Sequence, residues 1–165
     1  MQLNKSSRYG LYAVVMMAER PGELVSAALV AQTFAISEDH VAKVLQQLVR
    51  ARLVQGVRGV GGGYRLAADP RQVTMLDVVE ALEGPMQPAC YGCDVHPRDA
   101  GACVHPVSCA IRGVLEEIGQ YAWSTLKSIT LATLAASKAA GAEDPVALGA
   151  KLVTLGGVRR AGGTR

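Results

Sequence analysis

Four cysteines and two histidines lie in one short stretch, ACYGCDVHPRDAGACVHPVSC, at residues 89–109, although the whole chain contains only four Cys and three His. The cysteines are Cys90 and Cys93, then Cys103, then Cys109. The stretch has neither helical nor strand periodicity. Thiolates and imidazoles bind zinc, and thiolates hold iron–sulfur clusters. Disulfides, a metal ion or an iron–sulfur cluster each fit this pattern.

The N-terminal sequence argues against disulfides. Lys5 and Arg8 precede the apolar run YGLYAVVMMA, as in a signal peptide, but ERPGE follows at once without a small-residue cleavage site. We therefore expect a helix of a mature cytoplasmic protein, whose thiols stay reduced. No apolar run approaches the roughly 18 residues of a membrane span, so we expect no membrane partner. A metal or a cluster is then the leading interpretation.

Cysteine spacing alone does not separate zinc from an iron–sulfur cluster. Cys103 and Cys109 are too far apart for the two close pairs of a zinc ribbon, which disfavours zinc without excluding it. We expect Ser108 to cap a long helix, which places Cys109 in the first turn, where the helix dipole favours a thiolate. His96 and His105 are alternative ligands.

Composition and charge point to a globular protein with an anionic partner. Half of the 165 residues are hydrophobic, which suits one domain with an appendage. Residues 1–71 carry nine Lys or Arg against five Asp or Glu, whereas residues 72–165 carry eight against nine. The N-terminal part is therefore where an anion would bind.

A helix-turn-helix is predicted within VSAALVAQTFAISEDHVAKVLQQLVRARLV, after a first helix over residues 8–19. Ser26 and Ser37 are the expected caps of its two helices. The second helix has an apolar stripe that predicts burial, formed by Val41, Val44, Leu45 and Leu48. Because the second helix of this motif enters the major groove, its polar residues are candidate DNA contacts: Ser37, His40, Lys43, Gln46 and Gln47.

The next stretch, LVQGVRGVGGGYRLA, predicts a β-hairpin, or wing, with strands over residues 53–58 and 64–67 around a glycine-rich tip. A phosphate-binding loop of a nucleotide enzyme is disfavoured, because the Lys-Ser/Thr of a P-loop is missing and a strand follows. The wing residues expected near the minor groove or the DNA backbone are Arg58, Gly61, Gly62 and Arg65.

The fold class predicted is mainly α with a small β-hairpin. A helix over residues 73–84, with a Thr74–Asp77 capping box, completes a winged helix-turn-helix domain at residues 1–84. A cysteine-rich loop at 85–108 follows, then one long helix at 109–137 and a weakly ordered tail at 138–165. The long helix has an apolar seam typical of a dimerisation helix or of a helix packed on its own domain, at Ile111, Leu115, Ile118, Ala122, Leu126 and Ile129. We favour a homodimer.

These pieces resemble the Rrf2 family of winged-helix iron–sulfur regulators, which includes IscR and NsrR. The resemblance is carried by MQLNKSSRYGLYAVVMMA, AISEDHVAKVLQQLVRARLVQGVRGVGGGYRLA, VTMLDVVEALEG and CAIRGVLEEIGQYAWSTLKSITLATL. It implies a homodimeric cytoplasmic transcription regulator whose binding to promoter DNA changes when an iron–sulfur cluster is gained, lost or nitrosylated.

The resemblance also bears on the cluster ligands. Family members usually offer three cysteines separated by five residues each, and Cys103 and Cys109 match the last two. This chain has Arg112 where IscR-like members have a histidine ligand, and Arg8 where NsrR-like members have an aspartate. We therefore expect the extra cysteine to replace the usual fourth ligand. The predicted ligands of a 2Fe-2S or 4Fe-4S cluster are Cys90, Cys93, Cys103 and Cys109.

The function predicted is a dimeric regulator that senses cluster supply, iron, redox state or nitric oxide. The alternative is a zinc-stabilised winged-helix DNA-binding protein without cluster sensing. An enzyme is not expected: a thiol oxidoreductase using Cys90 and Cys93 would need a βαβ pattern that the chain lacks, and no Ser/His/Asp or paired-carboxylate site is evident.

Overall fold

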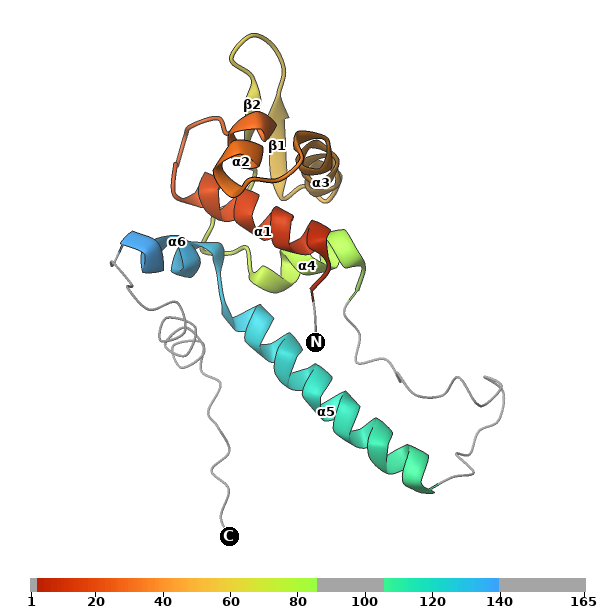
Figure 1. The fold of residues 1–165 in the computed structure, drawn as a ribbon. Helices are drawn as coiled ribbons and strands as arrows, with labels where there is room; N and C mark the ends of the chain where they lie inside the picture. The colour runs from red at the N-terminus through yellow and green to blue at the C-terminus, as the bar shows by residue number, and fades with distance from the viewer. Residues whose placement is uncertain (1–2, 86–105, 140–165) are drawn as a thin grey trace.

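The fold consists of helices with one two-stranded hairpin, as predicted (Figure 1). The computed structural model describes residues 3–85 and 106–139. In chain order the elements are α1 (Lys5–Ala18), α2 (Ala27–Phe34), α3 (Glu38–Arg50), β1 (Val54–Val57), β2 (Gly63–Leu66), α4 (Met75–Glu83), α5 (Pro106–Ser128) and α6 (Leu131–Ala139).

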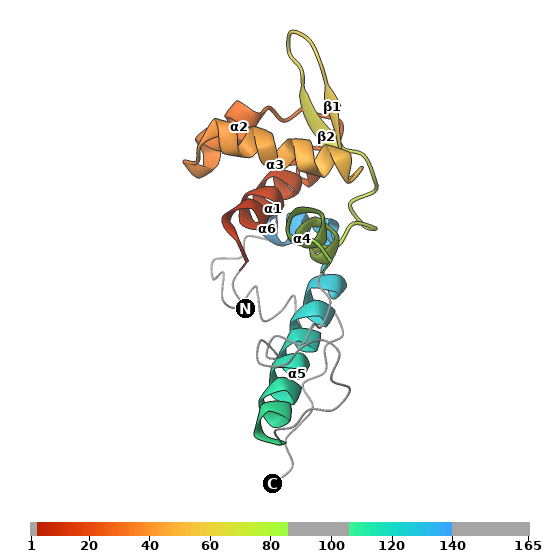
Figure 2. The same cartoon turned by 90° about the vertical axis from the view of Figure 1, so that its right-hand side faces the viewer.

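Helix α1 lies at the centre of the domain and contacts α3, α4 and α6 (Figures 1 and 2). It begins at Lys5, earlier than the predicted residue 8, because the Oδ1 atom of Asn4 accepts a hydrogen bond from the backbone N–H of Ser7 at 2.8 Å. This side-chain cap satisfies an amide that the helix itself leaves unpaired. Its apolar face is buried over Ala13, Val14, Met16 and Met17.

Helices α2 and α3 form the predicted helix-turn-helix. The Oγ atom of Ser26 accepts from the backbone N–H of Leu29 at 3.1 Å and starts α2. The turn passes through Ala35, which has a left-handed backbone (φ 53°). Ser37 is the N-cap residue of α3, as expected, but its side chain makes no capping hydrogen bond. The predicted apolar stripe of α3 is confirmed, since all four residues are at most 2% exposed.

Strands β1 and β2 pair antiparallel from Val54 opposite Leu66 to Val57 opposite Gly63, which confirms the wing. They differ from the predicted ranges by one residue at both ends of β1 and both ends of β2. The base of the hairpin is tied to the segment before α2. Tyr64 donates its N–H to the carbonyl of Val25 at 2.9 Å and accepts from the N–H of Val25 at 2.8 Å. The wing is therefore fixed to the helical body at its base.

Helix α4 starts with the predicted capping box. The Oγ1 atom of Thr74 accepts from the N–H of Asp77 at 3.2 Å, and a carboxylate oxygen of Asp77 accepts from the N–H of Thr74 at 2.7 Å. Gly84 follows the helix with a positive φ of 92°. Glu83, at the end of α4, accepts a hydrogen bond from the N–H of Asn4 at 3.0 Å, which joins the end of α4 to the start of α1.

The single helix predicted over residues 109–137 is two helices, α5 and α6, separated at Ile129 and Thr130. At this break the backbone pairs with the segment before α4. Met75 donates its N–H to Ile129 and Leu131 donates to Val73, both at 2.9 Å. The Oγ1 atom of Thr130 then accepts from the N–H of Thr133 and starts α6. Backbone pairing with a distant segment explains why a continuous apolar periodicity did not produce one helix.

The start of α5 also differs from the prediction. The helix begins at Pro106, a residue suited to a first helical position, so Ser108 lies inside the first turn and does not precede it. The C-terminal end of α5 packs into the domain through Leu126, and its N-terminal part projects away from the domain (Figures 1 and 2). No helix in the described residues is long and apolar enough to cross a membrane. The predicted tail lies outside the described residues from residue 140 onward.

Candidate nucleic-acid interface

Helix α3 lies beside the wing (Figure 2). Its exposed face carries polar side chains. Its apolar stripe faces α1 and α2, so the opposite side of the helix is free to meet a ligand. Of the predicted base-contacting residues, Ser37, Lys43, Gln46 and Gln47 are exposed. This arrangement of a polar helix next to a projecting hairpin is the one that reads duplex DNA in helix-turn-helix proteins.

A hollow of about 610 Å³ separates α3 from the wing. Gln46 and Arg50 line it from α3, and Gly56, Arg58, Gly62 and Tyr64 line it from the hairpin. Among the described residues, no acidic side chain lines this hollow. Its charge is therefore positive, which favours an anion. Arg50 was not among the predicted contacts; its position in the last turn of α3, seven residues after Lys43, is the signal that identifies it.

Gly61 and Gly62 at the wing tip are required for two different conformational reasons. Gly61 has a positive φ of 78°, which side chains rarely adopt. At Gly62 an added Cβ would collide with the carbonyl oxygen of Val57 and approach that of Gly59 to 2.9 Å. The tight tip of the wing therefore requires glycine at both predicted positions. Whether these glycines contact DNA stays a prediction.

Arg65 lies on the outer face of the wing. Its Nε and Nη2 atoms donate to the Oε1 atom of Gln55, opposite on β1, at 3.2 and 3.1 Å. Because side chains alternate along a strand, Arg65 points away from the side occupied by Tyr64, and it does not line the hollow. The Gln55 contact holds the guanidinium in one place on the exposed surface. Its role as a DNA contact stays a prediction.

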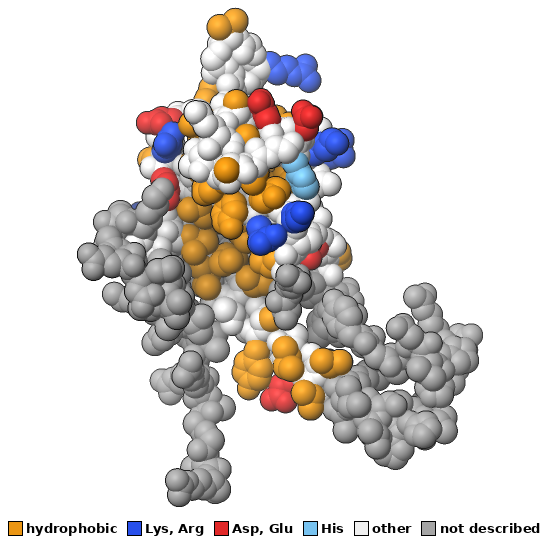
Figure 3. All heavy atoms as spheres, viewed as in Figure 1, with side chains coloured by type: hydrophobic (Ala, Val, Ile, Leu, Met, Phe, Trp, Pro, Cys, Tyr) orange, Lys and Arg blue, Asp and Glu red, His pale blue; other side chains and the backbone are white. Residues whose placement is uncertain are grey.

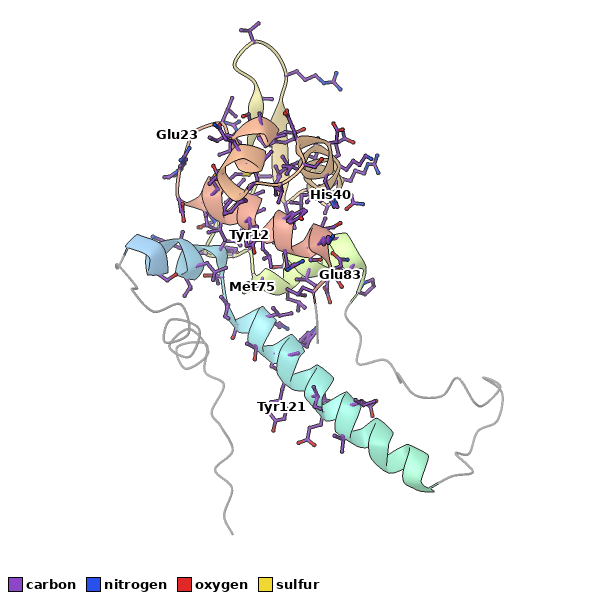
Figure 4. All side chains as sticks on the ribbon, in the orientation of Figure 1. Tyr12, Glu23, His40, Met75, Glu83 and Tyr121 are labelled. Carbon is purple, nitrogen blue, oxygen red and sulfur yellow. The ribbon has the colours of Figure 1, made fainter. Side chains whose placement is uncertain are left out.

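His40 is held against α1. Its Nε2 atom is 3.2 Å from the hydroxyl oxygen of Ser6, and its ring meets Tyr9 edge to face, with 5.1 Å between the ring centroids. Figure 4 labels His40 beside α1. The side chain is half-buried. The predicted base contact of His40 is untested, and the structure gives this residue a second role, fixing the start of α3 to the start of α1. The sequence interpretation missed Ser6 and Tyr9, because no local pattern links them to His40.

The predicted cluster site lies almost wholly outside the described residues. Cys90, Cys93 and Cys103 belong to the segment at 86–105, and Cys109 lies in the first turn of α5 with its side chain not described. In the described residues no three His, Cys, Asp or Glu side chains are grouped so that they could hold a metal ion. The chemistry of the donor set, four thiols in one segment, fits an iron–sulfur cluster.

Two apolar surfaces are exposed outside the DNA-facing side. A groove of about 460 Å³ between α1, α2, α6 and the start of α4 is lined by Tyr12, Val15, Phe34, Met75 and Leu134. The rings of Tyr12 and Phe34 stack on its edge with 4.7 Å between centroids. The projecting part of α5 exposes 57, 42, 52 and 51% of Val114, Leu115, Ile118 and Tyr121. Figure 3 shows both surfaces on one side of the molecule, over α1 and α6 and along α5.

The helix-turn-helix, its wing and the hollow between them define a winged helix-turn-helix DNA-binding protein. Residues 3–137 match the model of the Rrf2 family, described as an iron-dependent transcriptional regulator. The chain belongs to the Rrf2 family. It is therefore a transcription regulator and not an enzyme, which confirms both predictions.

Known relatives are similar over most of the chain. The putative HTH-type transcriptional regulator BadM of Rhodopseudomonas palustris is 42% identical over 134 residues, which are 81% of this chain and 81% of BadM. The structure of CymR (YrzC), the global cysteine regulator of B. subtilis, has a TM-score of 0.67 and 28% identity, covering 82% of this chain and 97% of that one. IscR of T. potens has a TM-score of 0.63 and 25% identity, covering 89% and 96%.

Proposed function

We propose that this protein is a cytoplasmic homodimeric regulator that binds promoter DNA through α3 and the wing, under the control of an iron–sulfur cluster. The observation that carries the DNA-binding part is the hollow between the polar face of α3 and the wing, which has arginines on both sides and no acidic side chain from the described part of the chain. The four clustered cysteines carry the cluster part.

In DNA binding, α3 enters the major groove and the wing lies near the adjacent minor groove. Gln46 and Gln47, with Ser37 and His40 toward the start of the helix, contact base edges, because amide and hydroxyl groups hydrogen-bond to bases. Lys43 and Arg58 bind phosphates and supply most of the affinity, as cations do at DNA. The glycines Gly61 and Gly62 let the wing backbone approach the groove, and Arg65 binds the backbone from the outer face.

Substituting the cations tests this assignment. Lys43→Ala and Arg58→Ala should each weaken binding to a palindromic promoter duplex about ten-fold and reduce the slope of log K against log salt by about 0.9. Arg71→Ala removes the same charge from an exposed residue outside the hollow and should leave both quantities unchanged. Unchanged binding by both Lys43→Ala and Arg58→Ala would show that α3 and the wing do not form the DNA interface.

The homodimer rests on the two exposed apolar surfaces. Soluble monomers rarely leave contiguous apolar patches without a partner. The projecting face of α5 can pack on the same face of a second copy, and the groove between α1, α2 and α6 is available to the partner's helix. A two-fold dimer sets the distance between the two copies of α3, which must match the spacing of the two DNA half-sites.

The cluster ligands proposed are Cys90, Cys93, Cys103 and Cys109, holding either two or four irons. A bound cluster would make the protein responsive to redox state, to nitric oxide or to the supply of iron and of clusters. Since Cys109 belongs to the first turn of α5, a change in its ligation acts on the helix that we propose joins the subunits. For DNA binding to change, the protein must make different contacts in the cluster-bound and the cluster-free states.

A visible spectrum and an iron, sulfide and zinc analysis of anaerobically purified protein test the cluster. We expect a brown sample with iron and sulfide, and both should be lost in the Cys93→Ala/Cys103→Ala/Cys109→Ala variant. A colourless sample with stoichiometric zinc would instead support a zinc-stabilised DNA-binding protein. Equal affinity of the reconstituted and stripped proteins for every promoter tested would contradict control by the cluster, but not DNA binding.

A further inference from the structure

We infer that the hollow between α3 and the wing binds the sugar–phosphate backbone of one DNA strand, with Arg50 and Tyr64 as phosphate contacts. The inference rests on the proposed function, because it assumes that α3 and the wing face the duplex. It adds to that proposal a defined site for the phosphodiester backbone and two residues, Arg50 and Tyr64, that were not among the predicted DNA contacts.

The position of the hollow requires a backbone to pass through it. If α3 occupies a major groove and the wing lies in the adjacent minor groove, the strand that separates these grooves must run between the two elements. The hollow is the space between them, and its volume of about 610 Å³ is within the range of known ligand sites. Arg50, Arg58 and Tyr64, which line the hollow, therefore meet phosphates and sugars rather than base edges.

The chemistry of the hollow suits a phosphodiester. Arg50 lies on the α3 side, and Arg58 follows β1 on the wing side, so two guanidinium groups flank the space. Guanidinium groups bind phosphate oxygens with paired hydrogen bonds. No acidic side chain among the described residues lines the hollow to oppose an anion.

Two residues with hydroxyl groups, Ser26 and Tyr64, also line the hollow and are candidate neutral donors. The oxygen of Ser26 accepts from the N–H of Leu29, so its own hydrogen remains to be donated. The hydroxyl of Tyr64 belongs to a residue whose backbone is held on both sides by Val25, at 2.8 and 2.9 Å. This pairing fixes the backbone of Tyr64 at the base of the wing before DNA binds, so little backbone conformational entropy is lost on binding.

Salt-dependent binding to a 30-base-pair duplex of mixed sequence tests the role of Arg50. Arg50→Ala should weaken binding about ten-fold and lower the slope of log K against log salt by about 0.9. Arg50→Lys should keep the slope, because it keeps the charge. Arg71→Ala, an equal loss of charge outside the hollow, should change neither quantity. Arg50 and Arg71 are both exposed, and an unchanged circular dichroism spectrum confirms that each variant is folded.

The same measurement on a promoter duplex distinguishes backbone from base contact. A phosphate contact predicts the same fold loss for Arg50→Ala on both duplexes, and about a five-fold loss for Tyr64→Phe, the loss of one hydrogen bond. A loss confined to the promoter duplex, or an unchanged salt slope, would overturn the inference. If Lys43→Ala and Arg58→Ala bind normally as well, the proposed interface itself is wrong; if only Arg50→Ala binds normally, the interface stands without this site.

Discussion

Helices α3 and α5 have similar apolar stripes but different surroundings. On α3, the stripe is covered by α1 and α2, and Val41, Val44, Leu45 and Leu48 are at most 2% exposed. On α5, the end near α4 is covered, whereas Leu115 and Ile118 remain about half exposed. An apolar stripe thus shows only that a helix packs against something. It does not show whether the partner is the same chain or a second copy.

Because their surroundings differ, the two stripes contribute to different processes. Burial of the α3 stripe contributes to the folding of each protomer, whereas burial of the projecting part of the α5 stripe, around Leu115 and Ile118, should contribute to association. Substitutions in the first should change stability at any protein concentration. Substitutions in the second should act on the oligomeric state, and on stability only through it.

Leu48→Ala should have the largest effect. Leu48 is fully buried in the core, so the substitution leaves a cavity and should lower the free energy of unfolding by about 3 kcal/mol. Urea denaturation at two protein concentrations measures it. The loss should be present at both. A loss below about 1 kcal/mol would mean that α3 is not packed as described.

Ile118→Asp should shift the monomer–dimer equilibrium. A charge on the exposed stripe of α5 should raise the dissociation constant about 100-fold, or about 2.7 kcal/mol, with little change in circular dichroism. Gln120→Asp places the same charge on the other side of α5 and should leave the dimer intact. Sedimentation velocity measures both variants. A dimer that survives Ile118→Asp would show that this face is not the interface.

His40→Ala should lower stability by about 1 kcal/mol, because it removes the Ser6 hydrogen bond and the Tyr9 ring contact. Its neighbour on α3, Lys43→Ala, should leave thermal stability unchanged and weaken DNA binding. The pair separates the contribution of His40 to the packing of α3 on α1 from a residue of α3, Lys43, that is proposed to act on DNA alone. Equal thermal stability of the His40→Ala variant and the wild-type protein would remove the proposed link between α1 and α3.

The smallest effect is expected at the start of α3. The side chain of Ser37 makes no capping hydrogen bond, so Ser37→Ala should change the free energy of unfolding by less than about 0.5 kcal/mol. Thr74→Ala, which breaks the capping box of α4, should cost about 1 kcal/mol. Denaturation of both variants gives the comparison. Equal losses would mean that Ser37 caps α3 in solution.

Much of the fold could be predicted because its signals are local. The caps at Ser26 and Thr74, the stripe on α3 and the glycines of the wing each depend on a few neighbouring residues. The break at Ile129 and Thr130 could not be predicted, because it depends on pairing with Val73 and Met75, far away in the sequence. For the same reason the sequence did not indicate the link of His40 to Ser6, or the place of Arg50 beside the wing.

The amino-acid sequence by itself determined the helix-turn-helix, the wing, the family and the clustering of four thiols, because periodicity, capping and composition are properties of the chain. The tertiary structure alone decided which half of the α5 stripe is buried, and which cations share a hollow with Arg58. Burial and proximity are set by what packs against each residue, and that is determined only when distant segments meet.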